Sequence, residues 1–343
     1  MSRNLTVTSV EPNAGIAGGE VIVHLLGVTA EMLPSLGVNF GGGDAHLVSV
    51  STARALALVP DVGADEPVEV ILETSRDRSS GGDPQFIIGK RLADNLHPVA
   101  NPAFHPADGS LFVTRSGTRG EHVPTSIFRV ESDGIVEEFS GDITNPTAIA
   151  FDRTGRMFVT SRFDGTVYRI TPDRQVVAFA SDLGIATGLA FNGEGDMFVG
   201  DRSGTIHRIN EIGLSKPWAE HEPSVSAYHL AMGPDDSLFV TGPTVSSFDS
   251  ITRFDAEGKP SVFFRGLGRP QGLAFDRDGN LYVAAALRGR RGIVRISADA
   301  KDARLVVAGM NMVGLAFGPA GQMVVATNEA VYSLPLGLRG LLI

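Results

Sequence analysis

Arginine recurs at one place in a repeated pattern, in the segment that follows a short apolar run. Its guanidinium group presents a planar fork of N–H donors, which matches the two oxygens of a carboxylate. The chain has a formal net charge of −10, so a cluster of cations at corresponding loop positions predicts an anion-binding surface. The arginines of this cluster are Arg115, Arg119, Arg162, Arg202, Arg288, Arg290 and Arg291, with Arg265 and Arg269 in a segment that leads into a repeat unit.

The alternative is that these arginines form ion pairs with acids beside them in the sequence. Exposed pairs are common, and each stabilises a protein by only about 0–1 kcal/mol. Arg288, Arg290 and Arg291 have no adjacent acid, so the anion-binding prediction rests mainly on them. The expected pairs are Arg202 with Asp201, Arg162 with Asp164 and Arg119 with Glu121.

Four other residues are ligand-binding candidates because of their type and their place in the repeats. His229, preceded by Tyr228, stands where most related units have Gly or Ala, and its imidazole could bind a ligand or titrate near neutral pH. A hydrogen-bonded histidine that fills the channel is the alternative. Gln271 precedes the corresponding Gly of the next unit. Trp218 lies in a predicted loop, Ser215–Ser224, where it could anchor a partner or equally pack between sheets.

A repeated hairpin pattern provides the elements that position these residues. Gly272–Val283 reads GLAFDRDGNLYV, and related segments recur along the chain at a spacing of about 40–47 residues. Each joins two short apolar runs through Gly/Asp turn residues, and further apolar runs follow. Four antiparallel strands per unit predict one blade, and six units predict a six-bladed β-propeller over residues 90–343. The last unit lacks a fourth run, so we expect a strand within Phe86–Leu92 to complete it.

Residues 1–89 do not follow this pattern. Their short apolar runs, separated by Pro, Gly and Asp turns, predict an immunoglobulin-like β-sandwich, so an all-β chain of two domains is expected. The segment contains Val10-Glu11-Pro12, Gly18-Gly19, Phe40-Gly41-Gly42, Val59-Pro60 and Phe86. Through these features it resembles the immunoglobulin-like IPT/TIG family, which implies a spacer or a protein-contact module.

Residues 101–336 resemble the NHL-repeat propellers and, more distantly, the gluconolactonase/senescence-marker and strictosidine-synthase-like propellers, through the AFDxxGxLYV units. For a gluconolactonase-type enzyme the resemblance implies a divalent metal at the ring centre, bound by Glu, Asn and Asp side chains just before the Gly that opens the innermost strand. None of the corresponding residues here is a carboxylate or Asn, so we expect no cofactor. They are Ala100, Thr147, Thr187, Tyr228, Gln271 and Val313.

Two functions remain as alternatives. The first is a non-catalytic binding or scaffold protein, whose propeller loops bind a protein or a small anionic ligand while the sandwich serves as a docking or spacer module. The second is a gluconolactonase-like hydrolase of lactones or esters, with calcium or another divalent metal in an atypical site around Asn101, Asn145 and His229. The missing carboxylates favour the first.

Composition narrows the partners further. The negative net charge argues against nucleic acid or an anionic membrane as a partner. The chain has no Cys, which excludes disulfides and thiolate zinc sites. The first residues contain no apolar signal core, so we expect a cytoplasmic protein, or a secreted one if a signal was removed.

Overall fold

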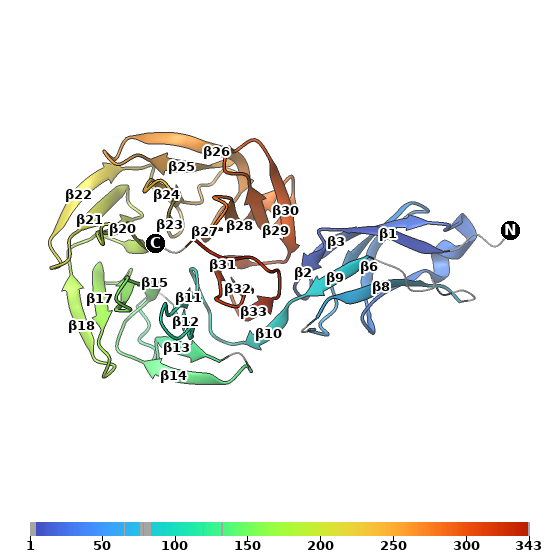
Figure 1. The fold of residues 1–343 in the computed structure, drawn as a ribbon, viewed down its shortest axis with the longest axis horizontal. Helices are drawn as coiled ribbons and strands as arrows, with labels where there is room; N and C mark the ends of the chain where they lie inside the picture. The colour runs from blue at the N-terminus through green and yellow to red at the C-terminus, as the bar shows by residue number, and fades with distance from the viewer. Residues whose placement is uncertain are drawn as a thin grey trace.

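The computed structural model describes residues 5–64, 66–75, 78, 84–118, 120–131 and 133–341. Over this part of the chain the fold is all-β, and the one helical element is a short 3₁₀ segment, η1 (Ala30–Ser35). No helix in the described ranges is long and apolar enough to cross a bilayer. Figure 1 shows a ring of sheets, with the N-terminal strands projecting from its edge.

The ring contains six four-stranded antiparallel units within the described residues, here called blades 1 to 6. Successive strands are hydrogen-bonded neighbours, so each blade runs from an innermost first strand to an outermost fourth strand. Blades 4 and 5 are also joined, because β26 pairs with β28 through Leu267 and Leu287.

The strand bounds follow the repeated pattern. Blade 1 holds β11 (Ala103–Phe104), β12 (Leu111–Thr114), β13 (Ile127–Val130) and β14 (Val136–Ser140). Blade 2 holds β15 (Pro146–Phe151), β16 (Met157–Ser161), β17 (Thr166–Ile170) and β18 (Val176–Ala180). Blade 3 holds β19 (Ala186–Phe191), β20 (Met197–Asp201), β21 (Thr205–Ile209) and β22 (Ser215–Glu220).

The second half of the ring repeats this order. Blade 4 holds β23 (His229–Met232), β24 (Leu238–Thr241), β25 (Asp249–Phe254) and β26 (Pro260–Gly268). Blade 5 holds β27 (Leu273–Phe275), β28 (Leu281–Leu287), β29 (Arg290–Ile296) and β30 (Ala303–Ala308). Blade 6 holds β31 (Met312–Phe317), β32 (Met323–Thr327), β33 (Val331–Leu334) and β10 (Lys90–Ala93).

The outer strand of blade 6 comes from the other end of the chain. β10 pairs with β33, with Lys90 opposite Ser333 and Arg91 opposite Tyr332. The range expected for this strand, Phe86–Leu92, is divided between two strands. Its first residues belong to β9 (Gln85–Ile88), because the ring of Phe86 packs edge to face on Phe40 in the N-terminal core, 5.0 Å between centroids.

Aromatic rings from neighbouring blades pack together and explain the Phe of the repeats. Between blades 1 and 2, Phe112 lies edge to face with Phe139 at 4.8 Å and with Phe151 at 5.5 Å. The same arrangement recurs between later blades. Such pairs stabilise a fold by about 0.5–1.5 kcal/mol beyond their burial. The related groups are Phe158 with Phe179 and Phe191, and Phe239 with Phe263 and Phe275.

Threonine hydroxyls join consecutive blades near the ring centre. Thr114 Oγ1 donates to the carbonyl of Thr147 at 3.0 Å, and Thr160 Oγ1 to that of Thr187 at 2.7 Å. Thr160 and Thr187 are almost fully buried, so each hydroxyl satisfies a carbonyl that would otherwise lose its hydrogen bond to water. These bonds fix the inner ends of the strands from which the loops emerge.

The N-terminal strands form two sheets around one hydrophobic core. The core includes Val23, Phe40, Leu72 and Phe86. One sheet has the order β1-β3-β7-β6, and the other has the order β2-β9-β8-β4-β5. Their bounds are β1 (Thr6–Glu11), β2 (Ala14–Gly15), β3 (Glu20–Leu26), β4 (Gly37–Phe40), β5 (Gly43–Asp44), β6 (His46–Val50), β7 (Arg54–Leu58), β8 (Val68–Glu73) and β9 (Gln85–Ile88).

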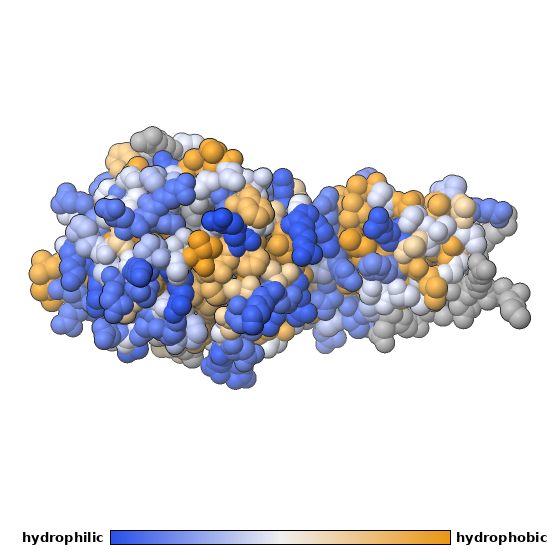
Figure 2. Space-filling model, turned by 90° about the horizontal axis from the view of Figure 1, so that it is seen from above, coloured by the Kyte–Doolittle hydropathy of each residue, from blue (hydrophilic) through white to orange (hydrophobic). Residues whose placement is uncertain are grey.

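The N-terminal region is hydrogen-bonded to blade 5. β2 pairs in parallel with β30, with Gly15 opposite Ala308, and the Ile16 amide donates to the Ala308 carbonyl at 2.9 Å. Ile16 is buried against ring residues, among them Met312. Figure 2 shows the region extending away from the ring, with apolar surface on the part that projects; Leu26, 62% exposed, is one of its exposed apolar side chains.

Candidate functional site

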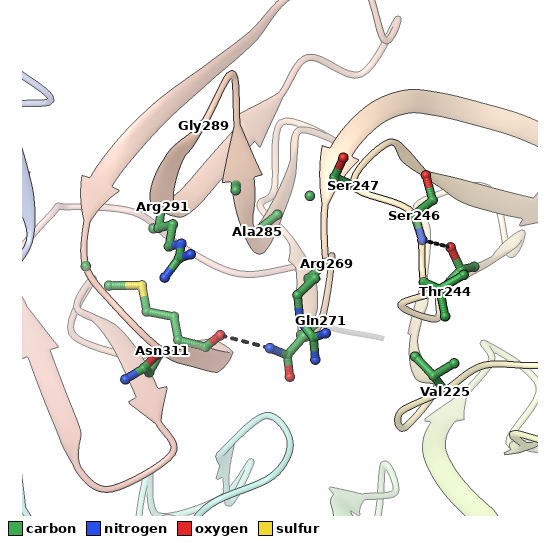
Figure 3. Close-up of a pocket in the computed structure, with 16 residues that line it drawn as sticks. Val225, Thr244, Ser246, Ser247, Arg269, Gln271, Ala285, Gly289, Arg291 and Asn311 are labelled. Carbon is green, nitrogen blue, oxygen red and sulfur yellow. Dashed lines mark hydrogen bonds between the residues drawn. The ribbon is translucent and has the colours of Figure 1, made fainter.

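One side of the ring, here called the loop face, carries the loops that follow each second strand and precede each first strand. One cavity on this face has a volume of about 610 Å³ and lies among loops of blades 4, 5 and 6. We call it the large pocket (Figure 3). It is lined by Val225, Thr244, Val245, Ser246, Ser247, Gly268, Arg269, Gln271, Ala285, Ala286, Gly289, Arg291, Gly292, Gly309, Asn311 and Met312.

The charge of the large pocket comes from arginine alone. Arg269 and Arg291 are exposed, and no lining residue is Asp or Glu. Figure 3 shows Arg291 on one side of the pocket, and Arg269 and Gln271 together near its centre. A cationic pocket without acids in its wall favours an anionic ligand, and guanidinium groups bind carboxylates with two parallel hydrogen bonds.

A buried carboxylate holds the loops behind the pocket. Asp249 accepts hydrogen bonds from the Thr244 hydroxyl at 2.6 Å and from the Arg269 amide at 3.3 Å. Asp249 is 4% exposed, so it organises the loops from inside. The Arg269 backbone has a φ of 47°, which turns the chain sharply between blades 4 and 5.

Uncharged polar groups complete the lining. The Gln271 side-chain nitrogen donates to the Met312 carbonyl at 3.4 Å, linking blade 5 to blade 6 across the wall (Figure 3). The amide oxygen of Gln271, the hydroxyls of Ser246 and Ser247 and the amide of Asn311 add donors and acceptors. The pocket wall therefore offers hydrogen-bond donors and acceptors beside its two cations.

A second cavity on the loop face, the small pocket, has a volume of about 330 Å³. Arg162 donates to the Ser116 hydroxyl at 3.1 Å, and Arg202 Nη1 donates to the Val225 carbonyl at 3.2 Å. Arg162 and Arg202 both line this pocket. The lining residues are Asn145, Arg162, Phe163, Gly184, Ile185 and Arg202, again without an acid.

Two of the acids expected to pair with arginines, Asp201 and Asp164, accept hydrogen bonds from other groups. Among the described residues Arg202 forms no ion pair with Asp201, whose carboxylate accepts from the Ile185 amide at 2.9 Å and from the hydroxyl of Ser203. Asp164 accepts from the Tyr168 hydroxyl at 2.6 Å. Burial and this hydrogen bond raise the pKa of Tyr168 to about 12. Arg119 lies outside the described residues.

The remaining arginines of the cluster are dispersed. Arg288 is exposed at the tip of the β28–β29 hairpin, outside the pocket lining. Arg115 lies near Glu121; the Thr118 hydroxyl and amide lower the pKa of that carboxyl, and the charge of Arg115 adds a smaller effect.

Arg290 does not face the pocket. Its guanidinium donates to the carbonyls of Glu11 and Glu20 in the N-terminal region, and burial lowers its pKa. Neighbouring residues of a strand point to opposite sides. Arg290 therefore joins the N-terminal region to the ring, while Arg291 faces the pocket, and only Arg291 of this pair remains a ligand candidate.

Tyr228 and Trp218 are packing residues. Tyr228 is fully buried between blades 3 and 4, where Gly200 and Gly242 leave room for it: a Cβ on either would lie within 3.0 Å of the ring. Trp218 belongs to strand β22, so the predicted loop Ser215–Ser224 is wrong over Ser215–Glu220. The indole packs edge to face on Phe198 at 4.8 Å, the role that Phe has in other blades.

His229 is buried at the start of β23, with 3% of its surface exposed. Burial lowers its pKa to about 4, so the imidazole is neutral at pH 7. Its Nε2 has no hydrogen-bond partner among the described residues. His229 lines neither the large pocket nor the small pocket.

The two asparagines suggested for an atypical metal site are hydrogen-bonded to backbone groups. The Asn145 amide accepts from the Gly120 amide at 2.7 Å and donates to the Gly117 and Thr118 carbonyls, so it holds a loop. Asn101 donates to the Leu273 carbonyl. No three His, Asp or Glu side chains in the described ranges come together as metal ligands. This donor set does not fit calcium, which requires six to eight oxygens.

Sequence reasoning missed part of the pocket wall. Thr244, Val245, Ser246 and Ser247 lie in the loop between β24 and β25, and Val225 lies in the loop before β23. The hydroxyl-rich segment TGPTVSS was the available signal, since loops placed by a rigid scaffold often carry binding residues.

Comparison with known proteins supports the architecture. No family model and no curated protein matches the chain. Among solved structures, an auxiliary nutrient binding protein from Bacteroides ovatus is 13% identical, with a TM-score of 0.55 over 96% of this chain and 97% of that chain. A gluconolactonase from Xanthomonas campestris is 17% identical, with a TM-score of 0.60 over 74% and 90% of the two chains. A putative gluconolactonase is 16% identical, with a TM-score of 0.61 over 75% and 94%.

The ring is a β-propeller. At these identities the likeness concerns the fold alone. The propeller scaffold brings loops of successive blades to one face, and this is how segments as distant as Val225 and Asn311 come to line the same pocket.

Proposed function

We propose that this chain is a non-catalytic binding protein. Its propeller, residues 90–343 with six blades, binds a carboxylate-bearing ligand in the large pocket, and its N-terminal β-sandwich, residues 1–89, is an IPT/TIG-like docking or spacer module. The observation that carries the proposal is the large pocket itself, in which Arg269 and Arg291 face a lining without Asp or Glu. The partners do not include nucleic acid or membrane, in keeping with the net charge of −10.

The dimensions and chemistry of the pocket support this proposal. A volume of about 610 Å³ lies within the range of small-molecule sites. Charge-assisted hydrogen bonds from the two arginines would fix the carboxylate, and Gln271 and Asn311 would contact the rest of the ligand. The solved nutrient binding protein, similar over nearly the whole chain, is compatible with a binding role.

The test is direct binding of small carboxylates. Gluconate, glucuronate and citrate are titrated calorimetrically into the wild-type protein and into R269A and R291A. We expect at least one of these acids to bind, and each substitution to weaken it about tenfold. The control is R277A, which makes the same charge change on the opposite side of the ring, where Arg277 is exposed. Equal affinities for R291A and R277A would contradict the proposal.

The second candidate is a lactonase-type hydrolase, which the fold likeness to the Xanthomonas enzyme favours. Its metal would need oxygen ligands at the ring centre, but the amide of Asn145 is already hydrogen-bonded and His229 is buried. Metal analysis of the purified protein, together with gluconolactone hydrolysis with and without EDTA, separates the two functions. Stoichiometric calcium or magnesium with EDTA-sensitive turnover would establish the hydrolase.

A further inference from the structure

The two loop-face pockets share a wall. Arg202 lines the small pocket, and its Nη1 donates to the carbonyl of Val225, a residue that lines the large pocket. The Val225 amide in turn donates to the Pro243 carbonyl at 3.1 Å, next to the Thr244 segment of the large pocket. A hydrogen-bonded chain of residues therefore leads from the Arg202 side to the Arg269 side.

The walls of both pockets include unusually exposed apolar side chains. Val245 is 95% exposed, Phe163 59% and Val225 53%, and all three lie on loop-face loops. Large apolar side chains with this exposure remain in contact with water unless a partner covers them. Phe248, 64% exposed, lies in the same loop as Val245.

We propose that the large and small pockets form one track that binds an acidic peptide segment of a protein partner. The segment would place carboxylates against Arg291 and Arg269 at one end and against Arg202 at the other, with apolar side chains on Val245, Val225 and Phe163 between and beside them. The inference rests on the proposed function for the large pocket and specifies its ligand.

The composition of the track distinguishes a peptide from a free metabolite. A small sugar acid would fill the large pocket and leave Phe163 and the small pocket uncovered. Aromatic side chains and arginines at the centre of an exposed surface are typical of protein–protein contacts. The pocket linings contain no acid, so an acidic segment meets no like charge within them.

The probe is an array of heptapeptides in which Glu and Asp alternate with Phe, Leu or Val. A matched series has Lys in place of the acids, and a third series contains acids with Ser. The best binder is then measured by fluorescence anisotropy at low and high salt. We expect binding only in the first series, and a loss of at least fivefold in affinity at high salt, because the contacts are partly ionic. Equal binding of the Lys series would overturn the proposal.

Variants separate the track from the large pocket alone. R202A and F163A should each weaken the heptapeptide about tenfold and leave gluconate or citrate binding unchanged, whereas R291A should weaken both. R277A is the matched control and should change neither. If R202A and F163A bind the heptapeptide like R277A while R291A still weakens citrate, the peptide track is wrong and the carboxylate pocket stands. If R291A also has no effect on either ligand, the proposed function fails as well.

Discussion

Two sets of arginines, one on each face of the propeller, act in opposite ways. On the turn face, which carries the turns between first and second strands, two arginines of the blades bind acids. Arg208 forms an ion pair with Asp196, and Arg253 forms one with Asp235. On the loop face, Arg269 and Arg291 line a pocket without acids. The same residue type thus stabilises the blade where a turn supplies an acid, and remains available to a ligand where it does not.

The repeat explains why the turn-face arginines are structural. Blades 1 to 5 have Arg near the end of the third strand, directly across from the second strand, whereas blade 6 has Ser333 there. In blade 3 Arg208 lies opposite Phe198, and in blade 4 Arg253 lies opposite Phe239. In these two blades the guanidinium reaches the hairpin turn of its own blade. In blade 5 the turn supplies an amide instead, and Arg295 donates to Asn280 at 2.8 Å. The loop-face arginines lie on loops of unequal length, where no such neighbour recurs.

The sharpest test of this contrast is the double variant R269A/R291A. Losing both cations of the large pocket should reduce carboxylate affinity at least 100-fold, which corresponds to about 2.7 kcal/mol. Stability should change by less than about 0.5 kcal/mol, as is usual for exposed side chains. Calorimetry and urea unfolding measure the two quantities. A large loss of stability would show that these arginines are structural, as on the turn face.

Arg290 offers an intermediate case, because it lies beside Arg291 but binds the N-terminal region. Replacement R290M removes the hydrogen bonds to the Glu11 and Glu20 carbonyls and loosens the hairpin that presents Arg291. We expect a three- to tenfold loss of carboxylate affinity, about 0.7–1.4 kcal/mol, although the side chain faces away from the pocket. The control R288M changes the exposed tip of the same hairpin. Equal affinities for R290M and R288M would exclude a positioning role.

On the turn face the expected effects are reversed. R208A should lower the free energy of unfolding by about 1 kcal/mol, since the ion pair with Asp196 is only partly exposed, and should leave carboxylate affinity unchanged. Urea denaturation of R208A beside R304A, an exposed arginine on the outer strand of blade 5, measures the difference. A change in ligand affinity for R208A would mean that the two faces are coupled.

The smallest effect concerns pH. Burial raises the pKa of Asp152, but hydrogen bonds from Thr154 and Arg156 outweigh it, so the pKa is lowered overall. A lowered carboxyl pKa stabilises the fold above the unfolded-state value, about 4, and this contribution is lost as the pH falls through the folded-state value. The melting temperature of D152N should therefore depend less on pH below about pH 4 than that of the wild type. Parallel melting curves for the two proteins would contradict this assignment.

Much of the architecture could be predicted from the sequence because the repeat encodes it locally. The GLAF and LYV runs give each blade its first two strands, and the recurring Phe of these runs pack between blades. Trp218 was ambiguous for a physical reason: it replaces a Phe in an outer strand, SKPWAE, whose Pro and polar residues read as a loop. Trp218 can be recognised as a packing residue from its position between aromatic rings, and the sequence alone does not give that position because it depends on how the blades assemble.

The site could be predicted only in part, because it depends on contacts distant in sequence. Nothing in the sequence distinguishes Arg290 from its neighbour Arg291. The contact with the N-terminal strands decides that Arg290 binds backbone carbonyls and that Arg291 lines the large pocket. Tyr228 was expected at a ligand site because of its place before the Gly-type position. Gly200 lies on the second strand of blade 3, and Gly242 follows the second strand of blade 4. These two glycines leave the space in which Tyr228 is buried.

The parallel pairing of β2 with β30 has a mechanical consequence. Strand hydrogen bonds run without interruption from blade 5 into the N-terminal sheet, and the Gly309 amide, one residue beyond that junction, donates to the Arg291 carbonyl. The N-terminal region and the ring are thereby held in one relative orientation. A partner that binds the N-terminal region therefore also sets the direction in which the loop face points.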